Sequence, residues 1–445
     1  MYCLSRMDTT VTQTDRDVVI IGAGIIGCAL AFELAKGGYK TLNLDTLPAA
    51  GYGSTSDSCA IVRAHYSTLQ GVTMAYEAFQ YWHDWEAYLG VGDERGLAQF
   101  VNTGTVALKA EGLNWKKVLG HYEAVGVEYE EWDASTLAER LPYLDLGSFW
   151  PPSRPDEDAF WNPSEGEITG AIFTPGSGYV NDPQLATHNL QVAAEAHGAR
   201  FRFGARVEEI HCEEGGVRGV VVDGERIEAR IVVNVAGPHS KIVNEMAGAL
   251  DDMNISTRPL RHEVHLVPAP PGIDFERDGY HVNDGDNVIY FRPETGNHIL
   301  VGSDDPPCDE KEWLDDPAKL DRTISKSQWE AQVYRLARRI PSLEIPRERK
   351  GIVGLYDVSD DWLPIYDRSG IDGFYMAVGT SGNQFKTAPV AARLVAEIID
   401  ACEHGHDHDA APIQVPCHYL DATLETSTFS RLREINRESS FSVNG

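Results

Sequence analysis

Hydrophobic residues near the start of the chain form two short runs, separated by a glycine-rich turn and a segment with helical spacing. Residues 17–22, DVVIIG, contain four consecutive β-branched apolar residues, which is typical of a parallel strand buried on both faces. Residues 28–38, CALAFELAKGG, have helical spacing and end in two glycines. Residues 41–45, TLNLD, return as a second strand. This order of elements predicts an α/β fold with a Rossmann-like domain.

The glycines between the first strand and the helix predict a dinucleotide site. In GAGIIG, Gly22 permits a tight turn, Gly24 lets the backbone approach a pyrophosphate, and Gly27 lets helix and strand pack closely. Amides at the helix start then face the phosphates. Asp45 ends the second strand, where it is placed to accept hydrogen bonds from a ribose. A glycine turn with a purely structural role is the alternative.

Apolar-rich runs farther along the chain predict a second, largely antiparallel sheet. Residues 287–304, NVIYFRPETGNHILVGSD, have two such runs around the turn cluster PETGN, which indicates a β-hairpin. TGTVALKA (103–110) and RHEVHLV (261–267) add strands. Residues 71–90 and 325–340 place aromatic and aliphatic side chains at helical spacing, which predicts helices that pack on a core.

Composition and charge argue against several classes of protein. The 38 Lys and Arg residues against 68 Asp and Glu give a net charge of −30, which repels nucleic acid and anionic lipid. No apolar stretch reaches the ~20 residues that a membrane span requires, and the first sixteen residues lack the apolar region of a secretory signal, so a cytoplasmic protein is expected. The seven cysteines are scattered without a CxxC pair, and we expect HGHDHD (404–409) to be a surface segment, so no metal site is predicted.

Four segments resemble flavoenzymes of the D-amino-acid oxidase superfamily. They are GYGSTSDS (51–58), ARFRFGARVEEI (199–210), RIVVNVAGPHS (230–240) and GTSGNQFKTAP (379–389). The likeness is greatest to the branch that contains sarcosine oxidase, dimethylglycine dehydrogenase and glycine oxidase. The resemblance implies FAD as the cofactor, bound by the glycine turn described above and by these four segments. The implied FAD-binding positions are Gly22, Gly24, Ile25, Ile26, Gly27, Asp45, Gly53, Ser54, Thr55, Ser56, Val207, Ala236, Gly237, Gly379, Ser381, Gly382, Asn383, Gln384 and Lys386.

The same resemblance implies a set of substrate-binding residues. GYGSTSDSCAIVRAHYST matches the stretch that places an arginine and a tyrosine beside the substrate, here Arg63 and Tyr66. An arginine offers a planar fork of donors to a carboxylate, and Lys386 matches a second ligand of that carboxylate. Tyr356 matches an active-site tyrosine, and Tyr290 on the hairpin is a weaker candidate. The alternatives are a structural ion pair for Arg63 and a solvated position at a helix start for Lys386.

Two departures from the family bear on the flavin chemistry. Gly354 stands where many monomeric sarcosine oxidases have the cysteine that is linked to the flavin, so we expect non-covalent FAD. Leu300 stands where those oxidases carry an oxygen-activating lysine, which leaves oxygen reactivity unsupported at this position. Substitutes for that lysine are sought among His298, Arg292, His262 and His265. In RPLRHEVH, charge pairing along a strand is expected, with a site for a second substrate carboxylate as the alternative.

The resemblance also predicts the domain organisation. A chain of 445 residues exceeds the size at which one core usually keeps growing, so two domains are expected. The predicted segments are an N-terminal arm (1–16), a discontinuous FAD-binding domain (17–93, 168–250 and 350–400), a substrate domain (94–167 and 251–349) and a C-terminal extension (401–445).

The predicted activity is FAD-dependent oxidation of a secondary or tertiary N-substituted amino acid, of the sarcosine, dimethylglycine or iminodiacetate type. Hydride passes to flavin N5, and water hydrolyses the resulting imine. The expected partners are this carboxylate-bearing substrate and O₂ or another electron acceptor; association into a homo-oligomer is left open. One alternative is a D-amino-acid oxidase or dehydrogenase that acts on primary amines. The other is a non-catalytic flavin-binding subunit.

Overall fold

Six strands form the sheet that carries the glycine-rich turn. The computed structural model describes residues 11–12, 17–110 and 113–444. The strand order is β12 (Arg200–Phe203), β3 (Thr41–Asp45), β2 (Val18–Ile21), β16 (Ile231–Asn234), β24 (Phe374–Val378) and β23 (Ile365–Arg368). The first five strands are parallel, and β23 runs antiparallel to β24. The predicted α/β class with a Rossmann-like domain is confirmed.

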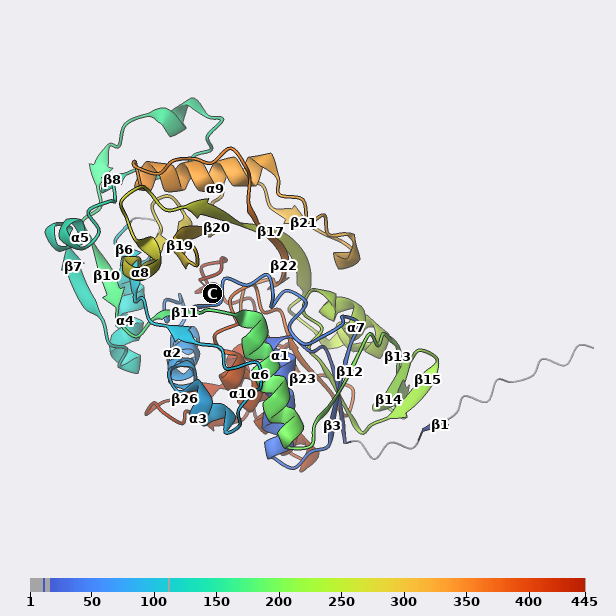
Figure 1. Ribbon diagram of the computed structural model, residues 1–445. Coiled ribbons are helices and arrows are strands. Elements are labelled where there is room, and N and C mark those ends of the chain that lie inside the picture. The colour runs from blue at the N-terminus through green and yellow to red at the C-terminus, as the bar shows by residue number, and fades with distance from the viewer. Residues whose placement is uncertain (1–10, 13–16, 111–112, 445) are drawn as a thin grey trace, which may run out of the picture.

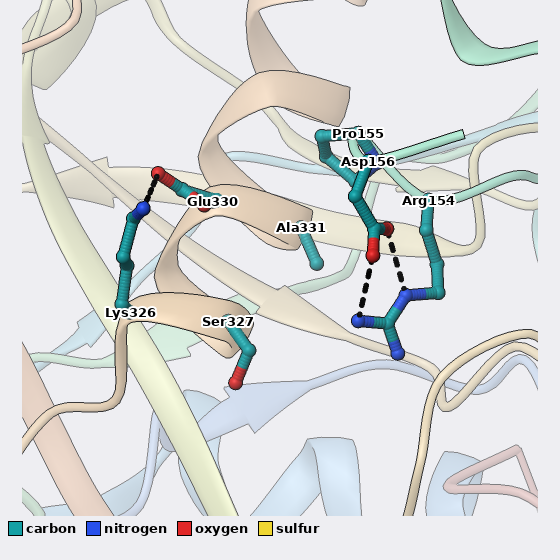
Figure 2. A pocket seen from close by; sticks show the side chains of 7 residues that line it. All are labelled: Arg154, Pro155, Asp156, Lys326, Ser327, Glu330 and Ala331. Carbon is teal, nitrogen blue, oxygen red and sulfur yellow. Dashed lines mark hydrogen bonds and ion pairs between the residues drawn. The ribbon is translucent and has the colours of Figure 1, made fainter. Parts of the chain in front are cut away.

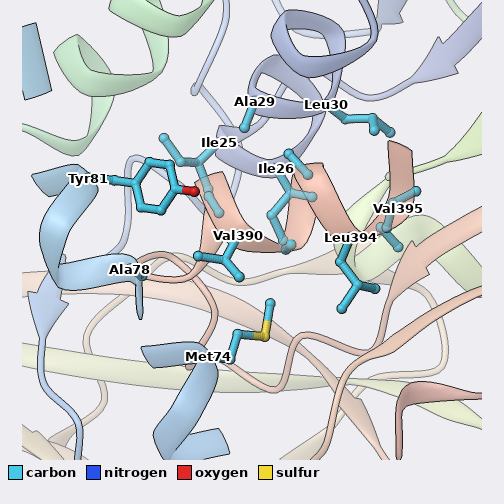
Figure 3. Packing of buried hydrophobic residues seen from close by; sticks show 14 of the residues in the cluster. Ile25, Ile26, Ala29, Leu30, Met74, Ala78, Tyr81, Val390, Leu394 and Val395 are labelled. Atoms are coloured by element: carbon cyan, nitrogen blue, oxygen red, sulfur yellow. The ribbon is translucent and has the colours of Figure 1, made fainter. Parts of the chain in front are cut away.

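Strand β2 is buried on both faces, as its unbroken apolar run predicts. Val18 and Ile20 belong to one hydrophobic cluster, and Val19 and Ile21 belong to another. On the first face, α1 (Ile25–Lys36), α2 (Leu69–His83) and α10 (Ala388–Glu403) pack together, with α6 (Pro183–Ala196) against α1. Figure 3 shows side chains of the first three helices meeting, among them Ile26 of α1, Met74 of α2 and Leu394 of α10. This packing fixes the position of the α1 N-terminus.

The second face of the sheet is covered by a smaller layer. It contains α7 (Ser240–Ala247) and a four-stranded sheet in the order β1 (Val11–Thr12), β15 (Glu225–Glu228), β14 (Gly216–Val222) and β13 (Val207–Glu213). Apolar residues of β13, β14, β15 and α7 share one cluster with residues of β2, β16 and β24.

A second, nine-stranded sheet lies above the first domain (Figure 1). Its order is β21 (Glu312–Trp313), β17 (Thr257–Pro268), β20 (His298–Ser303), β19 (Ile289–Glu294), β18 (His281–Asp284), β6 (Thr105–Leu108), β10 (Gly170–Thr174) and β7 (Glu130–Asp133), and β22 (Gly351–Ser359) also pairs with β17. All pairs are antiparallel except β18 with β6. The predicted hairpin is present as β19 and β20, and the largely antiparallel second sheet is confirmed.

The two predicted helical segments are present with small differences. The first, 71–90, is divided into α2 and α3 (Trp85–Leu89), because Asp84 leaves the helical conformation and its side chain accepts a hydrogen bond from the Ala87 N–H. The second, 325–340, is α9 (Lys326–Arg339), capped by Ser325, which accepts from the Gln328 N–H at 3.2 Å. Figure 1 shows α9 lying along the second sheet.

The other elements are short. The remaining helices are α4 (Trp115–Val125), α5 (Ala134–Arg140) and α8 (Phe275–Asp278), with 3₁₀ turns at Asp158–Trp161, Gly237–His239, Ala249–Asp252, Pro317–Lys319 and Thr426–Phe429. The remaining strands are β4 (Ile61–Val62), β5 (Phe100–Val101), β8 (Gly147–Ser148), β9 (Gly166–Glu167), β11 (Gly178–Val180), β25 (Gln414–Pro416) and β26 (Thr423–Glu425). Within the described ranges, no helix combines the length and apolarity of a membrane span. The proposed domain boundaries stay a prediction, and the arm at 1–16 lies outside the described residues apart from Val11 and Thr12.

A buried ion-pair cluster ties α9 to the second sheet. Arg339 Nε lies 2.8 Å from an Asp284 carboxylate oxygen, and its Nη2 lies 2.9 Å from Asp286. All three side chains are fully buried. Removing one partner of such a cluster leaves uncompensated charge in the interior.

We expect Arg339→Met to lower the free energy of unfolding by about 3 to 5 kcal/mol, because it strands two buried carboxylates. Denaturant unfolding of the FAD-loaded protein measures this. Lys326→Met is the matched control, since the exposed Lys326–Glu330 pair at 3.5 Å contributes at most about 1 kcal/mol. Equal losses in the two variants would contradict the assigned role of Arg339.

Candidate functional site

The turn between β2 and α1 brings backbones together so closely that only glycine fits. Gly22 has φ +119°, and a Cβ there would lie 2.4 Å from the Val235 carbonyl oxygen at the end of β16. A Cβ on Gly27 would lie 2.4 Å from the Gly22 carbonyl oxygen. The predicted roles of these two glycines, a tight turn and close helix–strand packing, match this geometry.

The start of α1 forms a cradle that fits a pyrophosphate. The Ile25 N–H donates to Thr55 Oγ1 at 3.1 Å, and a Cβ on Gly24 would lie 3.2 Å from the same oxygen. Loop 51–58 therefore lies across the helix N-terminus, where the backbone N–H groups carry positive partial charge. Ser54 Oγ fixes this loop by donating to the Leu355 carbonyl on β22 at 2.8 Å, and Ser56 Oγ donates to the Gly53 carbonyl at 2.8 Å.

Asp45 lies where the sequence predicts, at the end of β3. One carboxylate oxygen accepts from the Ala23 N–H at 2.8 Å, and the other accepts from the Leu47 N–H at 2.8 Å. The first bond ties the acid to the glycine turn. Each oxygen keeps acceptor capacity, so the carboxylate is oriented for a ribose hydroxyl. Ala236 and Gly237 follow the neighbouring strand β16, and Val207 begins β13.

A second glycine loop, residues 379–387, connects β24 to α10. Asp357 holds its start: the buried carboxylate accepts from the Gly379 N–H at 2.7 Å and from Ser240 Oγ at 2.9 Å, while the Asp357 carbonyl accepts from the Ser381 N–H at 2.8 Å. Burial raises the pKa of Asp357 to about 6. Trp82 holds the end of the loop by donating from Nε1 to the Lys386 carbonyl at 2.6 Å.

The turn, the two loops and Asp45 together fit FAD. Backbone N–H groups and hydroxyls converge on the α1 N-terminus, and an acceptor stands at the ribose position. The predicted FAD-binding positions from Gly22 to Asp45 lie at the turn and at the ends of its strands, and Gly53, Ser54, Thr55 and Ser56 lie in the loop across it. Gly379, Ser381, Gly382, Asn383, Gln384 and Lys386 lie in the second loop.

Three of the predicted substrate residues meet at the second loop. Lys386 Nζ donates to Tyr66 Oη at 2.8 Å and to the Asn383 carbonyl at 2.7 Å. Tyr66 Oη donates to the same carbonyl at 2.7 Å, and the Arg63 guanidinium carbon lies 5.0 Å from the centre of the Tyr66 ring. Residues more than 300 positions apart in the chain are thus neighbours.

The two cations of this group are buried without a compensating acid. Arg63 is 6% exposed and Lys386 is 4% exposed. Among the described residues, Arg63 donates only to the carbonyl oxygens of His65 and Val443 (2.7 Å to the latter), and neither cation pairs with a carboxylate. Burial, assisted by the Arg63 charge, holds the pKa of Lys386 well below its ordinary value. The surface and ion-pair alternatives considered for these two residues are therefore wrong.

Further polar atoms around the two cations have no partner in the described structure. They are His65 Nδ1, His281 Nε2, Asn283 Oδ1 and Asn383 Nδ2. The pKa of His281 is lowered by burial and then by the nearby charges of Arg63, Arg292 and Lys386. Buried polar atoms are normally hydrogen-bonded, so this group has the composition of a polar ligand site.

The two predicted tyrosines lie on the second sheet. The Tyr356 ring lies against Gly382, where an added Cβ would come within 2.5 Å of it, and stacks on His262 with centroids 4.5 Å apart. The Tyr290 hydroxyl lies 3.5 Å from Cys59 Sγ. Burial raises the pKa of both phenols, so both stay neutral.

Most of the basic residues considered as substitutes for the oxygen-activating lysine are paired or uncharged in the structure. Leu300 is opposite Arg292 in the sheet, but Arg292 Nη1 is paired with Glu294 at 2.9 Å. His262 is paired with Asp305 at 3.2 Å. Burial lowers the pKa of His265 to about 3, so it carries no charge near neutral pH. His298 alone is partly exposed on the turn of the hairpin. The charge pairing expected in RPLRHEVH is present, since Arg261 Nη1 lies 2.6 Å from Glu263.

The C-terminal segment is part of the site, which sequence reasoning missed. It runs into the middle of the molecule between the two sheets (Figure 1). The Val443 carbonyl accepts from Arg63, the Asn444 carbonyl accepts from the Ser67 N–H at 2.9 Å, and Asn444 Oδ1 lies 3.5 Å from Asn283 Nδ2. Val443 packs on apolar residues of β17 and β22.

Figure 2 shows a pocket of about 390 Å³ that lies apart from these residues. It is lined by Arg154, Pro155, Asp156, Lys326, Ser327, Glu330 and Ala331. Its charges are already paired, Arg154 with Asp156 at 3.0 Å and Lys326 with Glu330 at 3.5 Å. No predicted site residue lines this pocket, and we assign it no function.

We expect Gly24→Val to lose FAD, because a valine side chain would occupy the place of the pyrophosphate beside Thr55. The ratio of flavin absorbance to protein in the purified variant measures this. Gly120→Ala in α4, where an added Cβ meets nothing within 4 Å, is the control and should retain FAD fully. A yellow Gly24→Val protein would refute the assignment.

Comparison with known proteins agrees with this geometry. Residues 17–398 match the family model described as DAO, FAD dependent oxidoreductase. FAD-dependent oxidoreductase domain-containing protein 1 of Bos taurus is 24% identical over 425 residues, covering 88% of this chain and 83% of that protein. Glycine oxidase of Geobacillus kaustophilus is 23% identical over 411 residues, covering 90% and 97%. The solved structure of L-proline dehydrogenase from P. horikoshii has a TM-score of 0.73 at 21% identity, covering 94% and 97% of the two chains. The protein therefore belongs to the DAO family of FAD-dependent oxidoreductases.

Proposed function

We propose that this protein oxidises an N-substituted amino acid, with Arg63 and Lys386 binding the substrate carboxylate. The observation that carries the proposal is the burial of these two cations without an acidic partner. A substrate carboxylate would form ion pairs with both buried cations. The free energy gained in this way favours binding of the substrate. Names of relatives support an amino-acid substrate, since one is a glycine oxidase and another an L-proline dehydrogenase.

Each residue of the site has a defined task in this reaction. Arg63 presents its donor fork to the carboxylate, and Lys386 adds a point charge whose protonated form the anion stabilises. Tyr66 holds Lys386 in place through the 2.8 Å hydrogen bond. Tyr356 and Tyr290 form the wall contributed by the second sheet and exclude water as neutral phenols.

When bound, FAD would accept a hydride from the carbon next to the amine nitrogen. Loss of hydride from the α-carbon or the N-methyl carbon of the neutral amine leaves an iminium ion, which water hydrolyses. Orientation of the substrate by its carboxylate is what the chain itself contributes to this step.

Non-covalent attachment of FAD remains part of the proposal. A Cβ on Gly354 would lie 2.8 Å from Asp57 Cβ, so a cysteine at this position would need the 51–58 loop to move. The choice between O₂ and another electron acceptor stays open. Leu300 carries no charge that could activate oxygen. Arg292 lies directly opposite Leu300 in the sheet, but its charge is paired with Glu294.

Anaerobic titration with a panel of amino acids, followed by air, tests the proposal. Bleaching of the flavin by sarcosine, dimethylglycine or iminodiacetate supports it. Bleaching by D-alanine or D-arginine alone would identify the primary-amine alternative. A flavin that no amino acid bleaches would identify a non-catalytic flavin-binding subunit. Prompt recolouring in air with peroxide formation distinguishes an oxidase from a dehydrogenase.

We expect Arg63→Lys to lower kcat/KM for the best substrate by about 10- to 150-fold, because loss of the planar fork removes a charged hydrogen bond of ~1.5 to 3 kcal/mol. Steady-state kinetics of the FAD-loaded variant measure the effect. Arg258→Lys, at an exposed arginine paired with Asp315, is the control and should leave kcat/KM unchanged. An unchanged kcat/KM in Arg63→Lys would count against carboxylate binding there.

A further inference from the structure

A buried acid that the sequence analysis did not select lies near Arg63. Asp304 directly follows β20 and is 6% exposed. Its N–H donates to the Val288 carbonyl at 3.1 Å, which fixes its backbone. Its carboxylate accepts from Asn444 Nδ2 at 3.4 Å. Among the described residues, no cation lies within ion-pair distance of it.

The groups that face Asp304 come from several parts of the fold. Arg63, which follows β4, and His262 on β17 favour its charged form, and the neighbouring Asp305 disfavours it. Asp305 is already paired with His262 at 3.2 Å. The charge of Asp304 also reaches Tyr290 on β19 and Tyr356 on β22. Asp304 thus lies among the residues that the proposed function assigns to the substrate. Burial raises its pKa to about 6, which leaves it anionic near neutral pH.

The C-terminal segment shows which hydrogen-bonding groups fit beside Arg63 and Asp304. Adjacent residues of one chain put a carbonyl oxygen on Arg63, from Val443, and an amide N–H on Asp304, from Asn444. An amino acid has the same pair of groups, since its carboxylate accepts hydrogen bonds and its amine donates them. The segment therefore places a hydrogen-bond acceptor on Arg63 and a donor on Asp304, which are the two kinds of group that a zwitterionic amino acid offers.

The nearby histidines and phenols are poor acceptors for a proton. Burial and the Arg63 charge lower the pKa of His65 to about 3 and the pKa of His281 well below its ordinary value. The phenols of Tyr290 and Tyr356 are neutral, with raised pKa values. A neutral phenol or a histidine of so low a pKa takes a proton less readily than a carboxylate does at neutral pH.

We propose that Asp304 binds the amine of the substrate and takes its proton before oxidation. The inference rests on the proposed function, which it deepens by assigning the amine subsite. The amino acid arrives as a zwitterion; one ammonium N–H bond breaks, and the proton passes to a carboxylate oxygen of Asp304. The electron pair of that bond stays on nitrogen, where it assists loss of hydride from the adjacent carbon. Transfer also replaces a buried ion pair with two neutral groups, which a dry site favours.

The test is the pH dependence of anaerobic flavin reduction in single turnovers, for wild type and Asp304→Asn. In the wild type, the ratio of the reduction rate to the substrate Kd should fall below about pH 6, as Asp304 becomes protonated. In Asp304→Asn, the ratio at neutral pH should fall by about 10²- to 10⁴-fold. It should then rise tenfold per pH unit toward the amine pKa, because only amine that is already neutral reacts. Rescue at high pH is not expected of a structural defect.

Asp315→Asn is the matched control, because it makes the same change of charge at a fully exposed acid, and it should keep the wild-type pH profile. Calorimetric binding of acetate, which has a carboxylate and no amine, gives a readout besides turnover. Its Kd should stay the same or tighten in Asp304→Asn, because a negative charge near Arg63 is removed. An Asp304→Asn profile that parallels the wild type at every pH, or weakened acetate binding, would overturn the proposal. A wild-type flavin that no amino acid reduces would instead overturn the proposed function.

Discussion

Burial of two basic side chains, neither of them in an ion pair within the described part of the chain, is the constraint around which the site is built. Placing Arg63 and Lys386 away from water costs free energy that the protein offsets only in part, through carbonyl oxygens and the Tyr66 hydroxyl. The chain holds them there by packing that lies outside the site. Trp82 is stacked between Trp85 and Phe385, and its Nε1 donates to the Lys386 carbonyl. The hydrophobic core around α2 thus fixes the backbone position of Lys386.

The glycine turn between β2 and α1 is likewise held in place by packing outside the site. Gly22, Gly27 and the Val235 carbonyl meet at distances that exclude side chains, and that contact is maintained by the burial of β2 on both faces and by the helices around α1. The loops that reach the ligand carry hydroxyls and backbone donors, while β2 beneath them carries only apolar residues. Asp357 joins the two halves, because its strand belongs to the second sheet and its carboxylate holds the loop that leaves the first.

Local patterns in the sequence were sufficient for the turn, the hairpin and the two helices, because periodicity and glycine placement depend on neighbouring residues. That Arg63 and Lys386 lie together was predicted only from the family resemblance. No local sequence pattern relates two positions so far apart in the chain. Asp304 was missed because GSDDPP is typical of an ordinary polar turn, and its burial follows from long-range packing. The course of the C-terminal segment was missed for a similar reason. Arg431 pairs with Asp367 and Asp409, and Arg433 pairs with Asp361, so contacts distant in sequence direct it.

That course has a consequence for engineering the protein. The side chain of Asn444 touches Asp304 and Asn283, and the Val443 carbonyl accepts a hydrogen bond from Arg63. A change of size or polarity at Asn444 would therefore alter both the space and the hydrogen bonds that these residues can offer to a ligand.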